Sequence, residues 1–197
     1  MDYLESIDRQ LLLLINGLNS PFFDYVFHHI SQTITGMPLY LFIIYYFFKK
    51  FPKPRAFQYT VVLVLSVALA DLTSVHLFKD VFERYRPSHN LDIADKLHFV
   101  DGYRGGKYGF VSSHAANLFA LATFLILVFK RNALTIFVFI WACLGSYSRM
   151  YLGVHYPSDI IGGAILGSLI ANILYRFYFV NMNRTPAAEK SKMVEDL

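Results

Sequence analysis

The sequence predicts an all-α fold: a polytopic membrane bundle of about five transmembrane helices, preceded by an N-terminal interfacial amphipathic helix. Hydrophobic residues make up 55% of the 197 residues and charged residues only 16%, below the roughly 25% that is usual for soluble proteins. The apolar residues also gather in stretches near the ~20 residues that a helix needs to cross the hydrocarbon core. A bilayer is therefore the natural solvent for this chain.

The first twenty residues predict a helix that lies on the membrane surface. Their apolar block, Leu11 to Leu14, is too short to span a bilayer, and the turn-forming residues 19–21 are expected to end the helix. The first five residues are acidic where a signal peptide would be basic. Insertion must then be driven by the spans that follow.

Five apolar stretches are interpreted as membrane spans, and they cover about residues 22–48, 56–79, 113–129, 133–147 and 157–179. The first is more polar at its start, and Gly36 and Pro38 are expected to kink it. Six spans would result only if residues 2–20 also crossed, and five are preferred. Residues 1–180 are expected to form one membrane-embedded domain, and residues 181–197 a polar cytoplasmic tail.

Basic residues in the short loops predict the orientation. The loops on one side carry cations and no acidic residue: Lys49, Lys50, Lys53, Arg55, Lys130 and Arg131. This side is therefore assigned to the cytoplasm, and the chain to the inner, cytoplasmic membrane. Residues 80–110 and 148–156 then lie on the outer, periplasmic face.

The net charge and the cysteine count exclude a nucleic-acid partner and an internal disulfide. The net charge of +4 is modest, and the basic residues form no long stripe, so we expect no nucleic-acid partner. The single cysteine, Cys143, rules out a disulfide within the chain. Nothing in the sequence indicates an oligomeric state.

Three polar clusters stand at span ends on the predicted outer face. In the first, Lys79 and Arg86 are two helical turns apart and share a face if the helix continues. The second, residues 112–114, opens the third span, where a serine can cap the helix and the free amides attract an anion. Its third residue is His114.

The third cluster contains Arg149, His155 and Asp159. Pro157 suits the first turn of the last span, so Asp159 lies in that turn, four residues beyond His155. A carboxylate there can accept a hydrogen bond from one imidazole nitrogen and leave the other unprotonated for attack. Arg149 can neutralise an oxyanion nearby.

Together the clusters fit phosphoryl transfer, which needs cations for the phosphate oxygens, an in-line nucleophile and an acid for the leaving oxygen. They fit metal-dependent hydrolysis poorly, because Asp80, Glu83 and Asp159 are too scattered to hold a pair of metal ions. We expect no metal and no other cofactor.

These clusters resemble the three-part signature of the type 2 phosphatidic acid phosphatase superfamily, over residues 76–165. The matching motifs are Lys79-x6-Arg86-Pro87, the Ser-x-His segment ending at His114, and Ser148-Arg149-x5-His155-x3-Asp159. The second motif departs from the family pattern Pro-Ser-Gly-His, because Val111 and Ser113 replace its proline and glycine.

The resemblance implies the role of each residue. His155 attacks phosphorus and forms a phosphohistidine, Asp159 orients it, and His114 protonates the leaving oxygen. The phosphate is held by five residues: Lys79, Arg86, Ser112, Ser113 and Arg149.

With the membrane spans, the resemblance predicts an integral membrane phosphatase that hydrolyses a phosphate mono- or diphosphate ester of an envelope lipid. Undecaprenyl pyrophosphate or lipid A phosphate is favoured as the substrate, and phosphatidylglycerophosphate and phosphatidic acid stay open. One alternative is a vanadate-dependent haloperoxidase-like enzyme, against which the dense spans argue. The other is a non-catalytic lipid-binding membrane protein, against which the intact His114, His155 and Asp159 argue.

Two further features of the sequence, Asp71 and a glycine-rich stretch, lead to structural predictions. Asp71 lies within the second span, where a carboxylate is costly unless it is paired or functional, so we expect it to bond a neighbouring span or support the site. A glycine-rich stretch ahead of the third span is expected to form a flexible lid or turn: Gly102, Gly105, Gly106 and Gly109.

Overall fold

The computed structural model describes residues 3–181, and this part of the chain contains helices and loops but no strand. The main helices are α1 (Tyr3–Gly17), α2 (Pro21–Ser31), α3 (Thr33–Lys50), α4 (Lys53–Thr73), α5 (Asp80–Phe82), α6 (Ser113–Phe129), α7 (Ala133–Tyr151) and α8 (Pro157–Tyr175). Two π-helical segments, η1 (Ser74–Lys79) and η5 (Arg176–Asn181), extend α4 and α8. Three 3₁₀ turns, η2 (Pro87–His89), η3 (Ala94–Lys96) and η4 (Val100–Gly102), lie in the long connection before α6. The predicted tail lies outside the described residues beyond its first residue.

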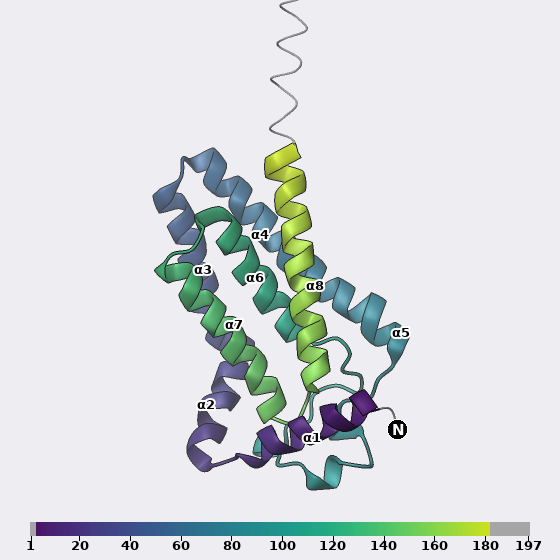
Figure 1. Cartoon of the computed structure of the whole chain (residues 1–197). Helices are drawn as coiled ribbons and strands as arrows, with labels where there is room; N and C mark the ends of the chain where they lie inside the picture. Colours follow the sequence, from purple (N-terminus) through teal and green to yellow (C-terminus); the bar gives the residue numbers. More distant parts are fainter. Residues whose placement is uncertain (1–2, 182–197) are drawn as a thin grey trace, which may run out of the picture.

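The long helices form one bundle, and α6 is its central element (Figure 1). It packs against α4, α7 and α8, and its contact with α8 is the most extensive. Glycines allow this close approach: a Cβ added at Gly167 would lie 1.9 Å from the carbonyl oxygen of Ala116. Apolar side chains such as Phe47, Leu121 and Phe124 fill the space between the helices.

The composition of the helices supports the membrane-embedded bundle that the sequence predicts. Among residues 3–181, three helices are long and apolar enough to cross a membrane, namely Lys53–Phe82, Ala133–Tyr151 and Pro157–Val180, and α6 is a shorter apolar helix. Large apolar side chains are exposed on the outer faces of α3, α4 and α8, where lipid would contact them. The number of crossings stays a prediction.

The first predicted span consists of two helices. α2 ends at Ser31 and α3 begins at Thr33, because Gln32 between them has an extended backbone. The interruption is thus earlier than the kink expected at Gly36 and Pro38, through which α3 continues. Its position follows from a tertiary contact, since Ser31 at the end of α2 bonds the guanidinium of Arg149 on α7.

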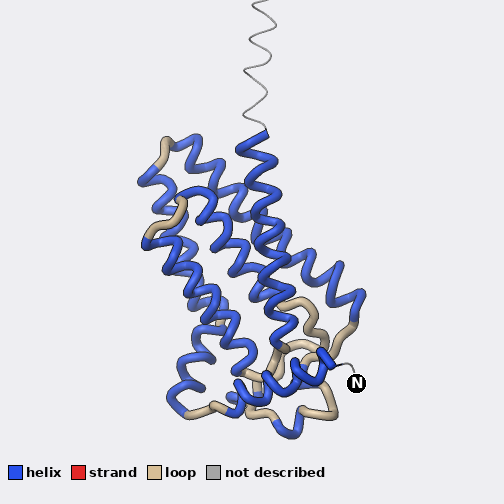
Figure 2. Tube along the Cα trace, in the orientation of Figure 1, coloured by secondary structure: helices blue, strands red, loops and turns tan. Residues whose placement is uncertain are grey.

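The helix predicted at the N-terminus is confirmed as α1, which lies across one end of the bundle (Figure 1). Leu12 is fully buried there, and the Asn16 amide donates to the carbonyl oxygen of Tyr151 at 2.7 Å. The long loops between α5 and α6 gather at the same end (Figure 2). The basic α3–α4 and α6–α7 connections lie toward the other end, so the structure separates the two predicted sides of the membrane.

Candidate active site

The predicted site residues all come from elements that meet at the end covered by α1. Lys79 ends η1, Ser113 begins α6, Arg149 lies in the last turn of α7, and Asp159 in the first turn of α8. The start of α6 is tied directly to α8, because the backbone N–H of Ser112 donates to the carbonyl oxygen of Asp159 at 3.0 Å. Residues from four separate segments thereby form one site.

His155 is buried in the tight turn between α7 and α8, with 2% of its surface exposed. Gly153 makes this turn possible, since its φ of 69° is one that other residues adopt at a cost. Nδ1 of His155 lies 3.3 Å from Oδ2 of Asp159, which also accepts the backbone N–H of Tyr156 at 2.9 Å. With the proton on Nδ1, the lone pair of Nε2 is free for attack.

The surroundings of His155 favour its neutral form. Burial lowers the pKa of His155 well below its ordinary value of 6.5, and the positive charges of Arg86, Arg149 and Lys79 lower it further. The imidazole is therefore neutral at neutral pH, with a free lone pair on Nε2, as a nucleophile requires.

Three cations surround this imidazole, and none of them forms an ion pair with a carboxylate among residues 3–181: Lys79, Arg86 and Arg149. Arg86 and Arg149 are buried, with 8% and 7% exposed. Burial, followed by the charge of Arg149, lowers the pKa of Arg86 to about 10. Buried cations without counter-ions are costly, so the site is built to receive an anion.

Neutral partners hold two of these cations in place. The Nε–H of Arg86 donates to the carbonyl oxygen of Tyr108 at 3.0 Å, while its buried Nη1 has no hydrogen-bond partner in the described structure. Arg149 donates to the hydroxyl of Ser31 and, at 2.8 Å, to the hydroxyl of Tyr103. Both guanidinium groups are thus oriented but not neutralised.

The third cation, Lys79, is oriented by a chain of hydroxyl groups. It bonds Oγ of Ser113, which lies 2.6 Å from Oγ of Ser74, and Ser74 in turn donates to the carbonyl oxygen of Asp71. Ser112 is used differently, since its Oγ caps α6 by accepting the N–H of Ala115 at 3.4 Å. The expected partner of Asp71 is also present: Asn117 on α6 donates to its carboxylate at 2.9 Å.

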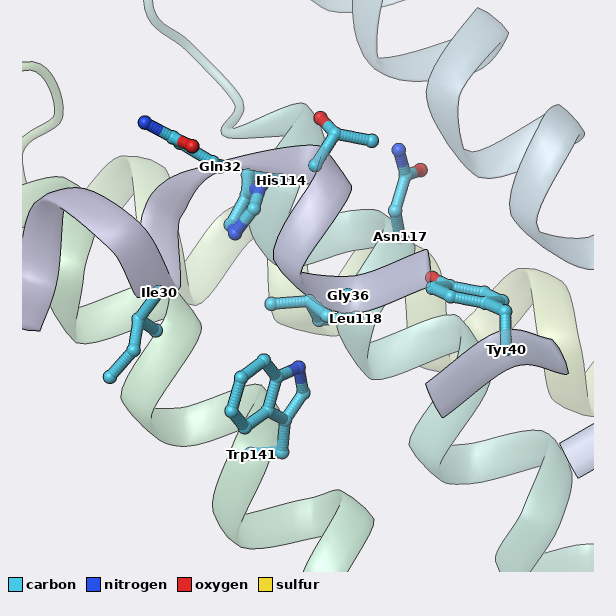
Figure 3. Close-up of a pocket in the computed structure, with 9 residues that line it drawn as sticks. Ile30, Gln32, Gly36, Tyr40, His114, Asn117, Leu118 and Trp141 are labelled. Carbon is cyan, nitrogen blue, oxygen red and sulfur yellow. The ribbon is translucent and has the colours of Figure 1, made fainter. Parts of the chain in front are cut away.

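His114 faces a small cavity between α3, α6 and α7 (Figure 3). The cavity measures about 90 Å³, and Tyr40, Leu118 and Trp141 line its apolar part. Nε2 of His114 is buried and has no hydrogen-bond partner in the described residues. The second histidine is therefore available to exchange a proton with a group that enters from this side.

The glycine-rich stretch packs against the site as a covering turn. A Cβ added at Gly105 would lie 2.7 Å from Nη1 of Arg86, and one at Gly109 would lie 3.1 Å from both Arg86 and Asp159.

Within residues 3–181, no three His, Cys, Asp or Glu residues are grouped so that they could hold a metal ion.

Sequence reasoning missed three residues that support the site: Asp8, Ser31 and Arg84. Arg84 donates to Asp159 at 2.9 Å and to Asp8 at 2.7 Å. Its position two residues before Arg86 was the available signal, because alternate residues of an extended segment point to the same side. Asp8 and Ser31 carry no local signal, since their partners are far away in the sequence.

A model of the PAP2 superfamily matches residues 55–183, which include all eight predicted site residues. The chain belongs to the PAP2 superfamily. Two relatives indicate that the chain is a phosphatase. The chain is 41% identical over 181 residues to a "Lipid A 4'-phosphatase" of Bacteroides thetaiotaomicron, covering 91% of this chain and 79% of that one. It is 36% identical over 184 residues to a "Lipid A 4'-phosphatase" of Porphyromonas gingivalis, covering 93% and 78%.

A solved PAP2 structure supports the membrane fold. The transmembrane PAP2 type phosphatidylglycerolphosphate phosphatase of Bacillus subtilis matches with a TM-score of 0.67 and 23% identity. The match covers 90% of this chain and 87% of that chain. The present chain is therefore a multi-pass membrane protein of the PAP2 superfamily and a membrane lipid phosphatase, that is, a phosphoric ester hydrolase.

Proposed function

We propose that this phosphatase removes the 4′-phosphate of lipid A through a phosphohistidine intermediate at His155. The three cations around His155 that lack a carboxylate partner carry the chemical part of this proposal. They match the charge of a phosphate monoester and leave the nucleophile neutral between them. The substrate is taken from the two relatives, which match most of the chain's length and are both lipid A 4'-phosphatases.

In the first step, the lone pair on Nε2 of His155 forms a bond to phosphorus. The bond between phosphorus and the sugar oxygen breaks, and that oxygen takes a proton from the protonated form of His114. Asp159 accepts the Nδ1 proton of His155 as a hydrogen bond and stabilises the positive charge that develops on the ring. Lys79, Arg86 and Arg149 neutralise the phosphoryl oxygens.

In the second step, water attacks phosphorus and gives a proton to His114, which returns to its starting state. The nitrogen–phosphorus bond breaks, and its electrons return to Nε2 of His155. The products are inorganic phosphate and the lipid alcohol. The cavity beside His114, with its apolar wall of Tyr40, Leu118 and Trp141, marks the side from which we propose that the leaving group approaches.

The same proposal places the site on the periplasmic face of the inner membrane. The cation-rich connections toward the far end of the bundle support this orientation, because cytoplasmic loops carry an excess of lysine and arginine. Substrate chains would then stay in the outer leaflet while the phosphate enters the site.

The test is phosphate release by the purified full chain in detergent micelles with EDTA present. The substrates are lipid A with phosphate at both positions, at position 1 only and at position 4′ only, with undecaprenyl diphosphate and phosphatidic acid alongside. We expect turnover of the two lipid A forms that carry a 4′-phosphate. Faster release from undecaprenyl diphosphate, or equal release from the position 1 form, would contradict the substrate assignment.

Two variants test the nucleophile. His155→Ala should lose about 10³-fold or more in kcat, because a covalent nucleophile is removed. His76→Ala is the matched control: His76 also pairs with an aspartate four residues on, at 3.1 Å from Asp80, but that pair is exposed. Base-stable, acid-labile phosphate should be trapped on the parent and the control and be absent from His155→Ala. Unchanged turnover in His155→Ala would refute the mechanism.

A further inference from the structure

The segment after α5 directs two arginines toward the active site. Residues 84–86 run antiparallel to residues 107–109: the N–H of Arg86 donates to the carbonyl oxygen of Lys107 at 3.0 Å, and the N–H of Gly109 donates to that of Arg84 at 2.9 Å. Side chains alternate along such a segment, so Arg84 and Arg86 point to one side and Tyr85 to the other. Arg86 belongs to the phosphate site, whereas Arg84 contacts no part of it directly.

Arg84 instead bridges two carboxylates. Its Nη1 donates to Oδ1 of Asp159 at 2.9 Å, and its Nη2 donates to Oδ2 of Asp8 at 2.7 Å. Its guanidinium also lies over the ring of Tyr156, 4.3 Å from the centroid. A planar group held on three sides in this way has one orientation.

The bond to Asp159 completes the hydrogen bonding of that carboxylate. Oδ2 receives the Nδ1–H of His155 and the backbone N–H of Tyr156, and Oδ1 receives Arg84. The side chain of Asp159 is fully buried, so it needs a nearby positive charge to stay ionised. An ionised Asp159 in this rotamer is what keeps the proton of His155 on Nδ1.

Asp8 of α1 fixes the same arrangement from the other side. Besides Arg84, it accepts the backbone N–H of Ser158 at 2.9 Å and the hydroxyl of Ser158. Ser158 lies in the first turn of α8, immediately before Asp159, so Asp8 caps the helix that carries the carboxylate. The side chain of Asp8 is 7% exposed.

We propose that Arg84 and Asp8 are positioning residues for the phosphatase reaction: Arg84 keeps Asp159 ionised and aimed at His155, and Asp8 holds Arg84 and the first turn of α8 in place, while neither touches the substrate. This inference rests on the proposed role of the His155–Asp159 pair. It gives Asp8 of α1 a supporting role in the reaction, although α1 contributes no atom to the phosphate site.

The test compares Arg84→Gln with Arg9→Gln. Arg9 is the matched control because it also bridges two carboxylates, Glu5 at 2.7 Å and Asp92 at 2.9 Å, away from the site. Phosphate release from lipid A in detergent micelles is measured over a range of pH. Arg84→Gln should lower kcat by about 10–100-fold, the range known for groups that orient metal-ligating side chains. Its KM should stay within about threefold of the parent value, because the residues that bind the substrate are unchanged.

A second readout separates positioning from general destabilisation. Without Arg84, Asp159 takes up a proton more readily, so the acid side of the kcat profile should move to higher pH, whereas partial unfolding would lower kcat equally at every pH. Arg84→Lys, which keeps the charge but not the two-pronged geometry, should recover part of the lost kcat. Arg9→Gln should match the parent in both respects.

Asp8→Asn decides the outcome if Arg84→Gln does not fold, because asparagine keeps one oxygen that can accept the N–H of Ser158 and replaces the oxygen that accepts Arg84 with an NH₂ group. It should show a smaller fall in kcat without a shift of the acid side to higher pH, because it also removes a negative charge beside Asp159. Parent kcat in Asp8→Asn, or parent kcat and an unmoved profile in a folded Arg84→Gln, would overturn the inference. If His155→Ala remained active, the proposed mechanism would fail instead, so the two failures are distinguishable.

Discussion

The packing of α6 on α8 leads to a prediction about Gly167. The nearest atom to an added Cβ is the carbonyl oxygen of Ala116 at 1.9 Å, far inside the 3.0 Å below which real Cβ contacts essentially never occur. This neighbour is backbone and cannot rotate away. Gly167→Ala must therefore push the two helices apart.

The size of the effect follows from two opposing contributions. Overpacking costs about 1–3 kcal/mol, and we take the upper value because the clash is with backbone. Alanine in place of glycine within a helix returns roughly 1 kcal/mol. The net loss of about 2 kcal/mol corresponds to a fall in Tm of about 4–8 °C for a chain of this length.

The displacement should also reach the active site. α6 carries His114 and α8 carries Asp159, and the bond from the N–H of Ser112 to the carbonyl oxygen of Asp159 joins them. A misplacement near 1 Å costs on the order of 10²-fold in rate, so kcat should fall by about that factor. Thermal unfolding in detergent and phosphate release measure the two effects.

Gly17→Ala is the control, because Gly17 lies in α1 and nothing approaches the position of its Cβ within 4 Å. It should leave Tm and kcat at or slightly above the parent values. Parent Tm and kcat in Gly167→Ala would show that the α6–α8 crossing does not require a glycine, and the reasoning would be wrong.

Three other changes have defined outcomes. Because burial and nearby cations lower the pKa of His155 below 6.5, protonation of this residue should abolish attack only below that pH; kcat/KM, corrected for substrate ionisation, should therefore not fall as the pH is lowered to 6.5, and an acid limb above that pH would contradict this. Tyr103→Phe removes one 2.8 Å bond to Arg149, so KM should rise about fivefold, from the roughly 1 kcal/mol of a hydrogen bond, with kcat unchanged; a fall in kcat alone would argue against phosphate binding by Arg149. Asn16→Ala removes three hydrogen bonds that hold α1 and should destabilise by about 2–3 kcal/mol; an unchanged Tm would mean that Leu12 and the ion pairs of Asp8 and Arg9 hold α1 without Asn16.

The spans were predictable from the sequence because hydropathy is a local property. A run of apolar residues identifies a helix in lipid whatever it packs against. The interruption at Gln32 was not predictable in this way, because the contact between Ser31 and Arg149 joins residues 118 positions apart. Glycine and proline give a local signal at Gly36 and Pro38, whereas the break between α2 and α3 lies at Gln32.

The candidate catalytic residues could be predicted only from motif spacing. Local sequence properties do not distinguish them from a similar pair of residues elsewhere in the chain. His76 and Asp80 have the same four-residue spacing as His155 and Asp159, and both pairs are within bonding distance. Burial distinguishes them: the exposed fractions are 67% and 57% in the first pair and 2% and 0% in the second. Burial depends on α1 and on the loops that fold over the turn, which no short window of sequence reveals.

The departure from the family motif at Ser113 has a physical consequence in this chain. Each hydroxyl has one proton, so the contacts order as Lys79 to Ser113, Ser113 to Ser74, and Ser74 to the carbonyl oxygen of Asp71. A glycine would leave the ammonium of Lys79 without this acceptor. The added side chain therefore orients the one flexible cation of the site, while the other two are oriented by Ser31, Tyr103 and the backbone around Arg86. Neutral groups therefore hold all three cations in place, and the positive charges of the cations stay available to bind the phosphate.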